Sequence, residues 1–214
     1  HLASWGFIVA STEHPERGLA ALMAGGAPDD NAVAQLQETI TRLQFENGSA
    51  KGFFFESMDF EKMGAVGHSA GGAAVGALAG ANTIRAWATL ASAGFKAAPN
   101  KDGLVMGGTS DQFATTKLVR EIFDQYDAGD EREKRLGSIA KAGHLAFTDG
   151  GVIGKEMGGL LNIAQAYGLE IPSMIVNLAN DGCLPSDLPA QEAWAIVNHY
   201  VTAVAKHEHL SYPL

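Results

Sequence analysis

A single short motif constrains this chain more than any other part of its sequence. Residues 67–71 read Gly-His-Ser-Ala-Gly, a G-x-S-x-G pattern that follows the apolar run 63–66 and precedes the small residues 70–78. A strand that turns sharply into a helix forces the central serine into a strained backbone conformation, and the flanking glycines let strand and helix approach each other. The sequence therefore predicts a buried strand, a tight turn and a helix, with the Ser69 hydroxyl exposed above a sheet.

The same turn is a candidate nucleophilic site. Ser69 would stand at the first turn of the helix, where the helix dipole and unpaired N–H groups favour negative charge. The Ala70 N–H would then point at an oxyanion developing on a carbonyl group under attack. The alternative, a glycine-rich turn with a capping serine, leaves the run Gly-Gly-Ala-Ala at 71–74 unexplained. We therefore predict Ser69 as nucleophile and the Ala70 N–H as oxyanion donor.

A serine nucleophile needs a histidine base, and several histidines follow the motif. His144 lies in a glycine-bearing loop, Lys-Ala-Gly-His-Leu at 141–145, directly after a short predicted strand. A loop at a strand end lets an imidazole reach over the sheet to the serine. The other three, His199, His207 and His209, lie in or just past a predicted C-terminal helix. His144 is the predicted base.

The base in turn needs an acid to orient it, which follows the serine and precedes the histidine in chain order. Asp111 fits this order and lies just after the apolar strand 104–107. Ligand chemistry in open α/β sheets gathers at the carboxyl ends of the strands, where this aspartate would lie. Asp149 and Asp181 are the competing candidates, the first because it is close to His144 in sequence. Asp111 is the predicted acid.

Apolar runs alternate with helical patterns along the chain, which indicates a mostly parallel α/β sheet flanked by helices. The predicted strands cover residues 7–10, 63–67, 85–90, 104–107 and 135–140, and the predicted helices begin near Asp30, Ala70, Thr115 and Pro189. Residues 2–6 read as a final helical turn that ends at Gly6. We expect one domain over residues 1–214, in which residues 151–185 form a helical, lid-like segment.

Composition excludes several classes of function. The 24 acidic and 15 basic side chains give a net charge of −9, which would repel nucleic-acid phosphates and anionic membrane surfaces. No apolar run approaches the roughly 20 residues that a membrane-spanning helix needs. The single cysteine, Cys183, excludes a disulfide within the chain and a cysteine-based zinc cluster. We expect no nucleic-acid partner, no membrane span, no metal and no organic cofactor; the oligomeric state stays open.

Four segments carry a family resemblance over nearly the whole chain. They are residues 2–15, Gly-His-Ser-Ala-Gly-Gly at 67–72, Gly-Gly-Thr-Ser-Asp at 107–111 and Ala-Gly-His-Leu-Ala-Phe-Thr-Asp at 142–149. Together they resemble an α/β-hydrolase of the dienelactone-hydrolase and platelet-activating-factor-acetylhydrolase kind, which borders the cutinase-like polyester hydrolases. The resemblance implies the α/β-hydrolase fold and the triad of Ser69, Asp111 and His144. It also favours a secreted or periplasmic bacterial protein.

The chain departs from that family in two places. Sheets of this kind have about three more strands before the point where this sequence starts, and the second oxyanion donor follows the third of them. The glycine pair Gly25-Gly26 is short and follows the wrong strand, so we expect the sequence to be N-terminally incomplete. Relatives often carry a second cysteine where this chain has Gly150 and Gly151. We therefore expect Cys183 to be free or to pair outside this sequence.

These observations predict a serine hydrolase that cleaves carboxylic esters, small or polymeric, through an acyl-enzyme. The same triad could act on lactones, thioesters or amides, and a catalytically silent binding module on this fold is the rival from another class. Phe113 and Phe147 flank the predicted acid and base, and His14 ends the first predicted strand. All three are candidate substrate contacts; the alternatives are packing for the phenylalanines and a solvated loop for His14.

Overall fold

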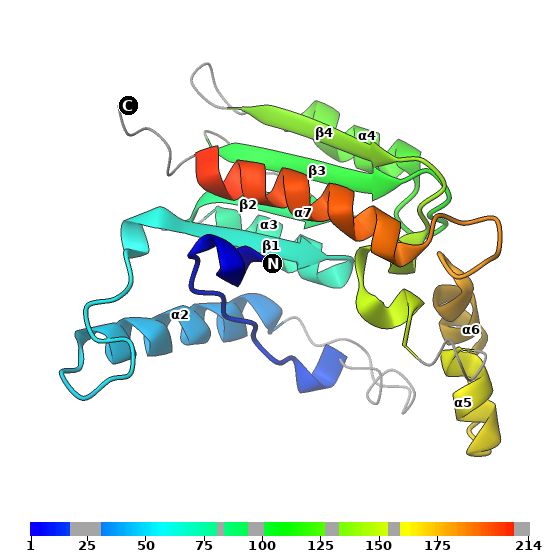
Figure 1. Cartoon of the computed structure of the whole chain (residues 1–214), viewed down its shortest axis with the longest axis horizontal. Coiled ribbons are helices and arrows are strands. Elements are labelled where there is room, and N and C mark those ends of the chain that lie inside the picture. The colour runs from blue at the N-terminus through cyan, green and yellow to red at the C-terminus, as the bar shows by residue number, and fades with distance from the viewer. Residues whose placement is uncertain (18–30, 81–83, 94–100, 127–132, 154–158, 208–214) are drawn as a thin grey trace.

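The computed structural model describes residues 1–17, 31–80, 84–93, 101–126, 133–153 and 159–207. Its centre is a four-stranded, all-parallel sheet of order β1-β2-β3-β4 (Figure 1). The strands are β1 (Met63–His68), β2 (Ile84–Leu90), β3 (Asp102–Gly108) and β4 (Lys134–Ile139). Strands that follow one another along the chain lie side by side, with the parallel pairing that alternating strands and helices predict. The predicted parallel α/β sheet flanked by helices is confirmed.

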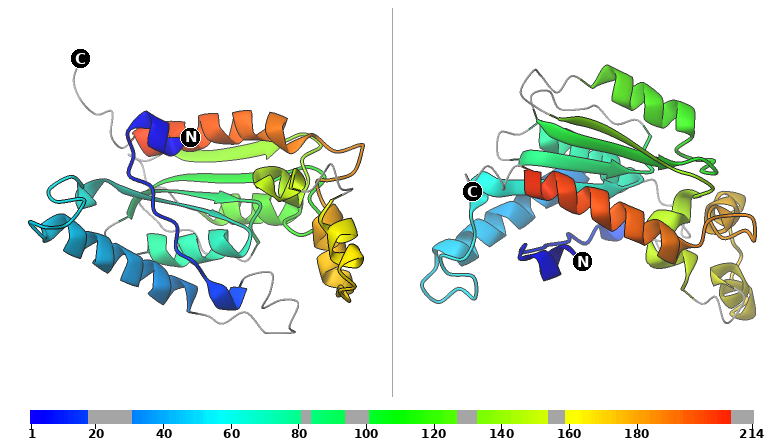
Figure 2. Two further views of the ribbon diagram at one scale, coloured as in Figure 1. Left: turned by 60° about the horizontal axis from the view of Figure 1, so that its bottom comes forward. Right: turned by 45° about the horizontal axis from the view of Figure 1, so that its top comes forward.

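Helices cover both faces of this sheet (Figure 2). On one face α3 (Ala70–Ala79) packs on β1 and β2, and α4 (Thr116–Gln125) packs on β3 and β4. On the other face α7 (Ala190–His207) packs on β2 and β3. A further helix, α2 (Ala32–Gly48), packs against α3; Asp30, its predicted start, lies outside the described residues.

The core lies around the two central strands. Every residue of β3 and all but one of β2 are buried, because each of these strands has helices on both faces. The largest fully buried side chains include Trp87, Leu104 and Met106. In contrast β1 alternates between half-buried and exposed residues, and within the described part of the chain it pairs with β2 alone. The sheet is therefore best buried at β2 and β3, between the strands β1 and β4, which precede Ser69 and His144.

The predicted strand at residues 7–10 is wrong. The preceding turn is as predicted, since the 3-10 helix η1 (Leu2–Trp5) ends at Gly6 with a left-handed φ of 90°. Residues 7–10 have no strand pairing, and Ile8 and Val9 are about half-exposed, at 45% and 56%. A strand needs a neighbour to bond its N–H and C=O groups. This segment passes β1 towards α2 (Figure 1), where Thr12 bonds Thr39, so its apolar run stays outside the sheet.

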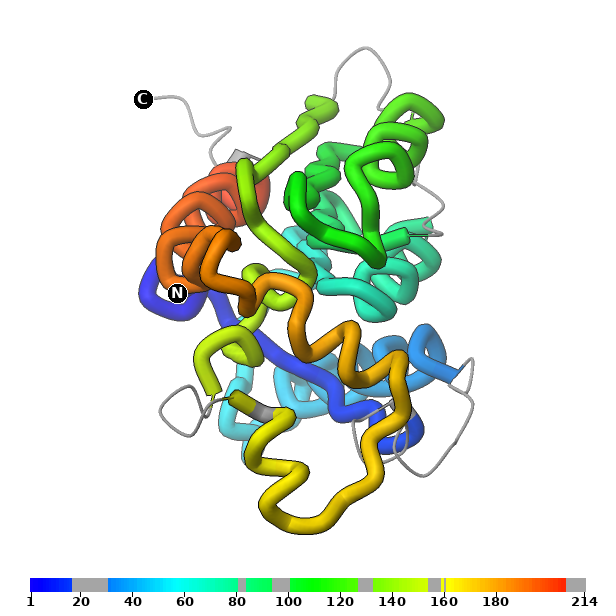
Figure 3. The backbone as a smooth tube through the Cα atoms, turned by 90° about the vertical axis from the view of Figure 1, so that its right-hand side faces the viewer, coloured from blue at the N-terminus to red at the C-terminus, as the bar shows by residue number. Residues whose placement is uncertain are grey.

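Short helices gather beyond the carboxyl ends of the strands (Figure 1), on the side that faces the viewer in Figure 3. They are the 3-10 helices η4 (His144–Phe147) and η5 (Asp149–Gly151), and the α-helices α5 (Leu160–Ala166) and α6 (Ser173–Asn180). Two other 3-10 helices lie earlier in the chain: η2 (Pro15–Arg17) precedes α2, and η3 (Phe60–Lys62) directly precedes β1. The segment expected to be helical between residues 151 and 185 does contain two helices; its role as a lid stays a prediction. Among the described helices, none has the length and apolarity needed to cross a bilayer.

Candidate active site

The G-x-S-x-G motif forms the sharp strand-to-helix turn that the sequence predicts. Ser69 lies between the last residue of β1 and the first of α3, with φ 54° and ψ −122°. Such positive φ values are rare outside glycine, so the turn holds Ser69 in a strained conformation. A Cβ on Gly67 would lie 2.2 Å from the Gly71 carbonyl oxygen. Only glycine at position 67 lets the strand and the helix come this close.

Three predicted side chains meet at this turn. His144 Nε2 lies 2.8 Å from Ser69 Oγ, and His144 Nδ1 lies 3.0 Å from Asp111 Oδ2. His144 and Asp111 are buried, and Ser69 is half-buried. A carboxylate at Nδ1 holds the proton on that nitrogen and leaves Nε2 as an acceptor for the serine hydroxyl. The three groups form one line of hydrogen bonds from the interior to Ser69.

Backbone groups hold the carboxylate of Asp111 in place. Its Oδ1 accepts from the N–H of Phe113 (2.8 Å) and from the N–H of Ala114 (2.7 Å). These bonds use one oxygen and leave Oδ2 facing the ring of His144. The end of β3 also lies close to the loop that carries His144, since a Cβ on Gly108 would lie 2.0 Å from the Ala142 carbonyl oxygen.

The two competing aspartates lie differently. Asp149 is exposed at the start of η5, where its carbonyl oxygen accepts from the N–H groups of Val152 and Ile153. Asp181 is buried, at 2% exposed, and its Oδ1 accepts from the backbone N–H of His144 (2.8 Å). Of the three candidates, Asp111 is the one in contact with the imidazole ring.

His68 is a site residue that sequence reasoning missed. Its Nε2–H donates to the carbonyl oxygen of His144 (3.0 Å), and the two rings lie 4.8 Å apart between centroids. Burial lowers the pKa of His68 to about 4, and the charge of the neighbouring His144 adds to this effect. His68 is therefore neutral near pH 7. Its place beside Ser69 in the motif was the signal that could have found it.

The candidate substrate contacts differ in their surroundings. The ring of Phe113 lies 5.3 Å from that of His144 and is 36% exposed, so it borders the site on the solvent side. Phe147 is 8% exposed and stacks on His68 at 6.2 Å. His14 is half-buried and bonds Gln35 of α2. For all three, contact with a substrate stays a prediction.

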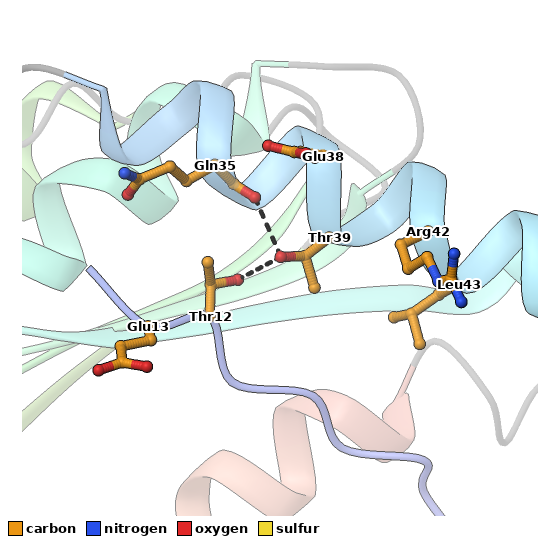
Figure 4. A pocket seen from close by; sticks show the side chains of 7 residues that line it. All are labelled: Thr12, Glu13, Gln35, Glu38, Thr39, Arg42 and Leu43. Atoms are coloured by element: carbon orange, nitrogen blue, oxygen red, sulfur yellow. Dashed lines mark hydrogen bonds between the residues drawn. The ribbon is translucent and has the colours of Figure 1, made fainter. Parts of the chain in front are cut away.

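A separate hollow lies between the N-terminal segment and α2 (Figure 4). Its volume is about 310 Å³, and its lining is Thr12, Glu13, Gln35, Glu38, Thr39, Arg42 and Leu43. The Thr12 and Thr39 hydroxyls bond at 2.7 Å, and the Thr39 hydroxyl also donates to the Gln35 carbonyl oxygen at 3.0 Å. The bond between Thr12 and Thr39 holds the N-terminal segment to α2. The lining of the hollow includes no member of the Ser69 site.

Comparison with known proteins gives partial structural likenesses. No family model matches the sequence, and no curated protein sequence matches it. The esterase domain of a Rhodothermus marinus protein is 20% identical, with a TM-score of 0.32, and the match covers 38% of this chain and 50% of that one. A protein of Agrobacterium tumefaciens described as an alpha/beta hydrolase of unknown function is 14% identical, with a TM-score of 0.42, covering 68% and 66%.

A third likeness is to an alpha-beta serine hydrolase homologue of Coxiella burnetii. It is 14% identical, with a TM-score of 0.39, and the match covers 67% of this chain and 62% of that one. The chain therefore spans between half and about two thirds of the lengths of these three proteins.

Proposed function

We propose that this chain is a serine hydrolase of the α/β-hydrolase type that cleaves carboxylic esters. One observation carries the proposal: the hydrogen bonds run without a break from Asp111 through His144 to Ser69, at 3.0 and 2.8 Å. The strained backbone of Ser69, with φ 54°, supports it further because such a turn lifts the hydroxyl above the sheet. A nucleophile, a base and an orienting acid in this order can activate a serine.

In the acylation step, Ser69 Oγ forms a bond to the ester carbonyl carbon while its proton passes to His144 Nε2. Asp111 stabilises the imidazolium that results, since its Oδ2 already accepts from Nδ1. The tetrahedral intermediate then collapses, the bond to the alkoxy oxygen breaks, and the alcohol leaves with the proton from Nε2. The acyl group stays on Ser69.

Deacylation repeats these steps with water. His144 takes a proton from the water, whose oxygen bonds the acyl carbon, and the Ser69 Oγ–carbon bond then breaks. The proton returns from Nε2 to Oγ, and the carboxylic acid is released. The proton of each step is therefore carried by residues already within hydrogen-bond distance, 2.8 Å for Nε2 and Oγ.

The negative charge of the intermediate would be stabilised at the start of α3. Ala70 is the first residue of this helix, so its N–H has no acceptor one turn earlier within the helix. An oxyanion on the substrate can accept from it, and one such donor stabilises the transition state by about 3 kcal/mol. The positive end of the helix dipole adds to this effect.

An activated serine and an ester preference are tested separately. A fluorophosphonate probe labels only an activated serine, so we expect one adduct on Ser69 and none on the Ser69→Ala variant. A panel of p-nitrophenyl esters of rising chain length, with matched thioesters, lactones and anilides, then reports the substrate class. Absence of labelling in the wild-type protein would favour a silent binding module. Labelling with faster turnover of thioesters, lactones or anilides would change the proposed class of substrate.

A further inference from the structure

Asp181 has an unusual environment for a carboxylate. It is 2% exposed, and all three of its oxygen atoms accept hydrogen bonds from backbone N–H groups. Oδ1 accepts from His144, Oδ2 from Gln112 and the carbonyl oxygen from Leu145, each at 2.8 Å. Burying a carboxylate is costly unless its lone pairs are used, and these bonds offset that cost.

The donors of these bonds belong to the two loops of the candidate site. Gln112 follows Asp111 directly, and His144 is the ring-bearing residue itself. Asp181 lies 69 residues from Gln112 and 37 from His144 along the chain, so its carboxylate bridges segments that are distant in sequence. One oxygen fixes the backbone that carries the ring, and the other fixes the backbone next to the acid.

Two glycines make room for this bridge. A Cβ on Gly143 would lie 2.5 Å from Asp181 Oδ1 and 2.2 Å from the Gly182 nitrogen, distances that no real side chain could keep. Gly182 has a left-handed φ of 97°, which turns the chain away immediately after the aspartate. The carboxylate itself is held at the end of α6, because the Asp181 N–H donates to the Asn177 and Leu178 carbonyl oxygens at 3.1 and 3.2 Å.

We propose that Asp181 is a positioning residue, which holds the Asp111 loop and the His144 loop at the separation that the triad needs. This inference rests on the proposed function. The carboxylate oxygens of Asp181 reach backbone N–H groups and not the imidazole, so Asp181 acts through His144 and Asp111. Without the bridge, the 3.0 Å approach of Nδ1 to Oδ2 would lose one of its supports.

The test compares Asp181→Asn with a matched control. An asparagine has nearly the same shape, but its amide can accept only one of the two N–H groups and sets an NH₂ against the other. The control is Asp102→Asn, which changes an equally buried aspartate that accepts from the Glu133 N–H at the opposite end of β3. Both variants replace a buried carboxyl group with an amide, but only Asp181→Asn changes a side chain that bonds the site loops.

We expect Asp181→Asn to lower kcat for a p-nitrophenyl ester by about 10- to 100-fold with KM within about twofold, since misplacing a base costs rate. The downfield proton NMR resonance of the His144 Nδ1–H should shift or vanish. Asp102→Asn should leave kcat and this resonance unchanged, whatever it does to stability. An Asp181→Asn protein with wild-type kcat and resonance, or an equal loss in Asp102→Asn, would overturn the proposal.

One further measurement, amide hydrogen exchange, depends neither on the variants folding nor on turnover. In the wild-type protein, the amide hydrogens of Gln112 and His144 should exchange slowly with solvent because a buried carboxylate holds them; rapid exchange of both contradicts the proposal. If the wild-type protein neither labels with a fluorophosphonate nor hydrolyses an ester, the proposed function fails. The NMR comparison then still reports whether Asp181 sets the pairing of His144 with Asp111.

Discussion

Acid should destabilise this protein through His68, a ring that the fold keeps neutral. Its Nε2–H donates to the His144 carbonyl oxygen at 3.0 Å, and its ring contacts those of His144 and Phe147. Burial is the main reason that the pKa of His68 falls from 6.5 to about 4, and the charge of His144 lowers it further. The bond to the His144 carbonyl and the carboxylate of Asp111 oppose this change and only partly offset it.

The size of the effect follows from the two pKa values. In the unfolded chain His68 takes up a proton near pH 6.5, whereas in the folded protein it stays neutral down to about pH 4. Between these values the unfolded state binds more protons, so the free energy of unfolding falls as the pH falls. At about 1.36 kcal/mol for each pKa unit, this loss amounts to about 3 kcal/mol between pH 7 and pH 4. Above pH 6.5 the contribution is constant.

Urea unfolding at a series of pH values, on the wild-type protein and on His68→Gln, measures this loss. Glutamine does not titrate, and its side-chain amide can still donate to the His144 carbonyl oxygen. The difference in unfolding free energy between the two proteins should therefore change by about 3 kcal/mol from pH 7 to pH 4. His199→Gln, on the exposed side of α7, controls for the loss of a histidine. Parallel curves for the wild type and His68→Gln down to pH 4 would refute the reasoning.

Three other substitutions test the candidate site. Ser69→Ala should lower ester turnover by about 10⁴- to 10⁶-fold with little change in melting temperature, since the half-buried hydroxyl packs little; a retained tenth of the activity contradicts the assignment. Asp111→Asn should lower kcat by about 10⁴-fold, because an amide at this position favours the imidazole tautomer that cannot accept the serine proton. Asp149→Asn, at an exposed position, should have a kcat near that of the wild type. Gly67→Ala should weaken both fluorophosphonate labelling and thermal stability, because its Cβ would lie 2.2 Å from the Gly71 carbonyl oxygen; unchanged values would show that the turn can open.

Much of the fold could be predicted because its signals are local. The runs that became β2 and β3 are mostly apolar, as strands covered on both faces require, and glycine spacing located the turn at Ser69. Residues 7–10 show the limit of such reasoning. Their apolar pattern equals that of a buried strand, but pairing depends on a neighbour elsewhere in the chain, and Val9 is 56% exposed.

The sequence by itself determined the elements around the site: a strained serine between strand and helix, an aspartate just after a strand, and a histidine in a glycine loop. These are properties of a few adjacent residues and their backbone stereochemistry. Only the tertiary structure decided which aspartate faces the ring and what the others do. Asp111 follows β3 and meets Nδ1, whereas Asp181 follows α6 and bridges two backbone segments. Such contacts join residues 33 to 69 positions apart, and their geometry is fixed by packing rather than by local preference.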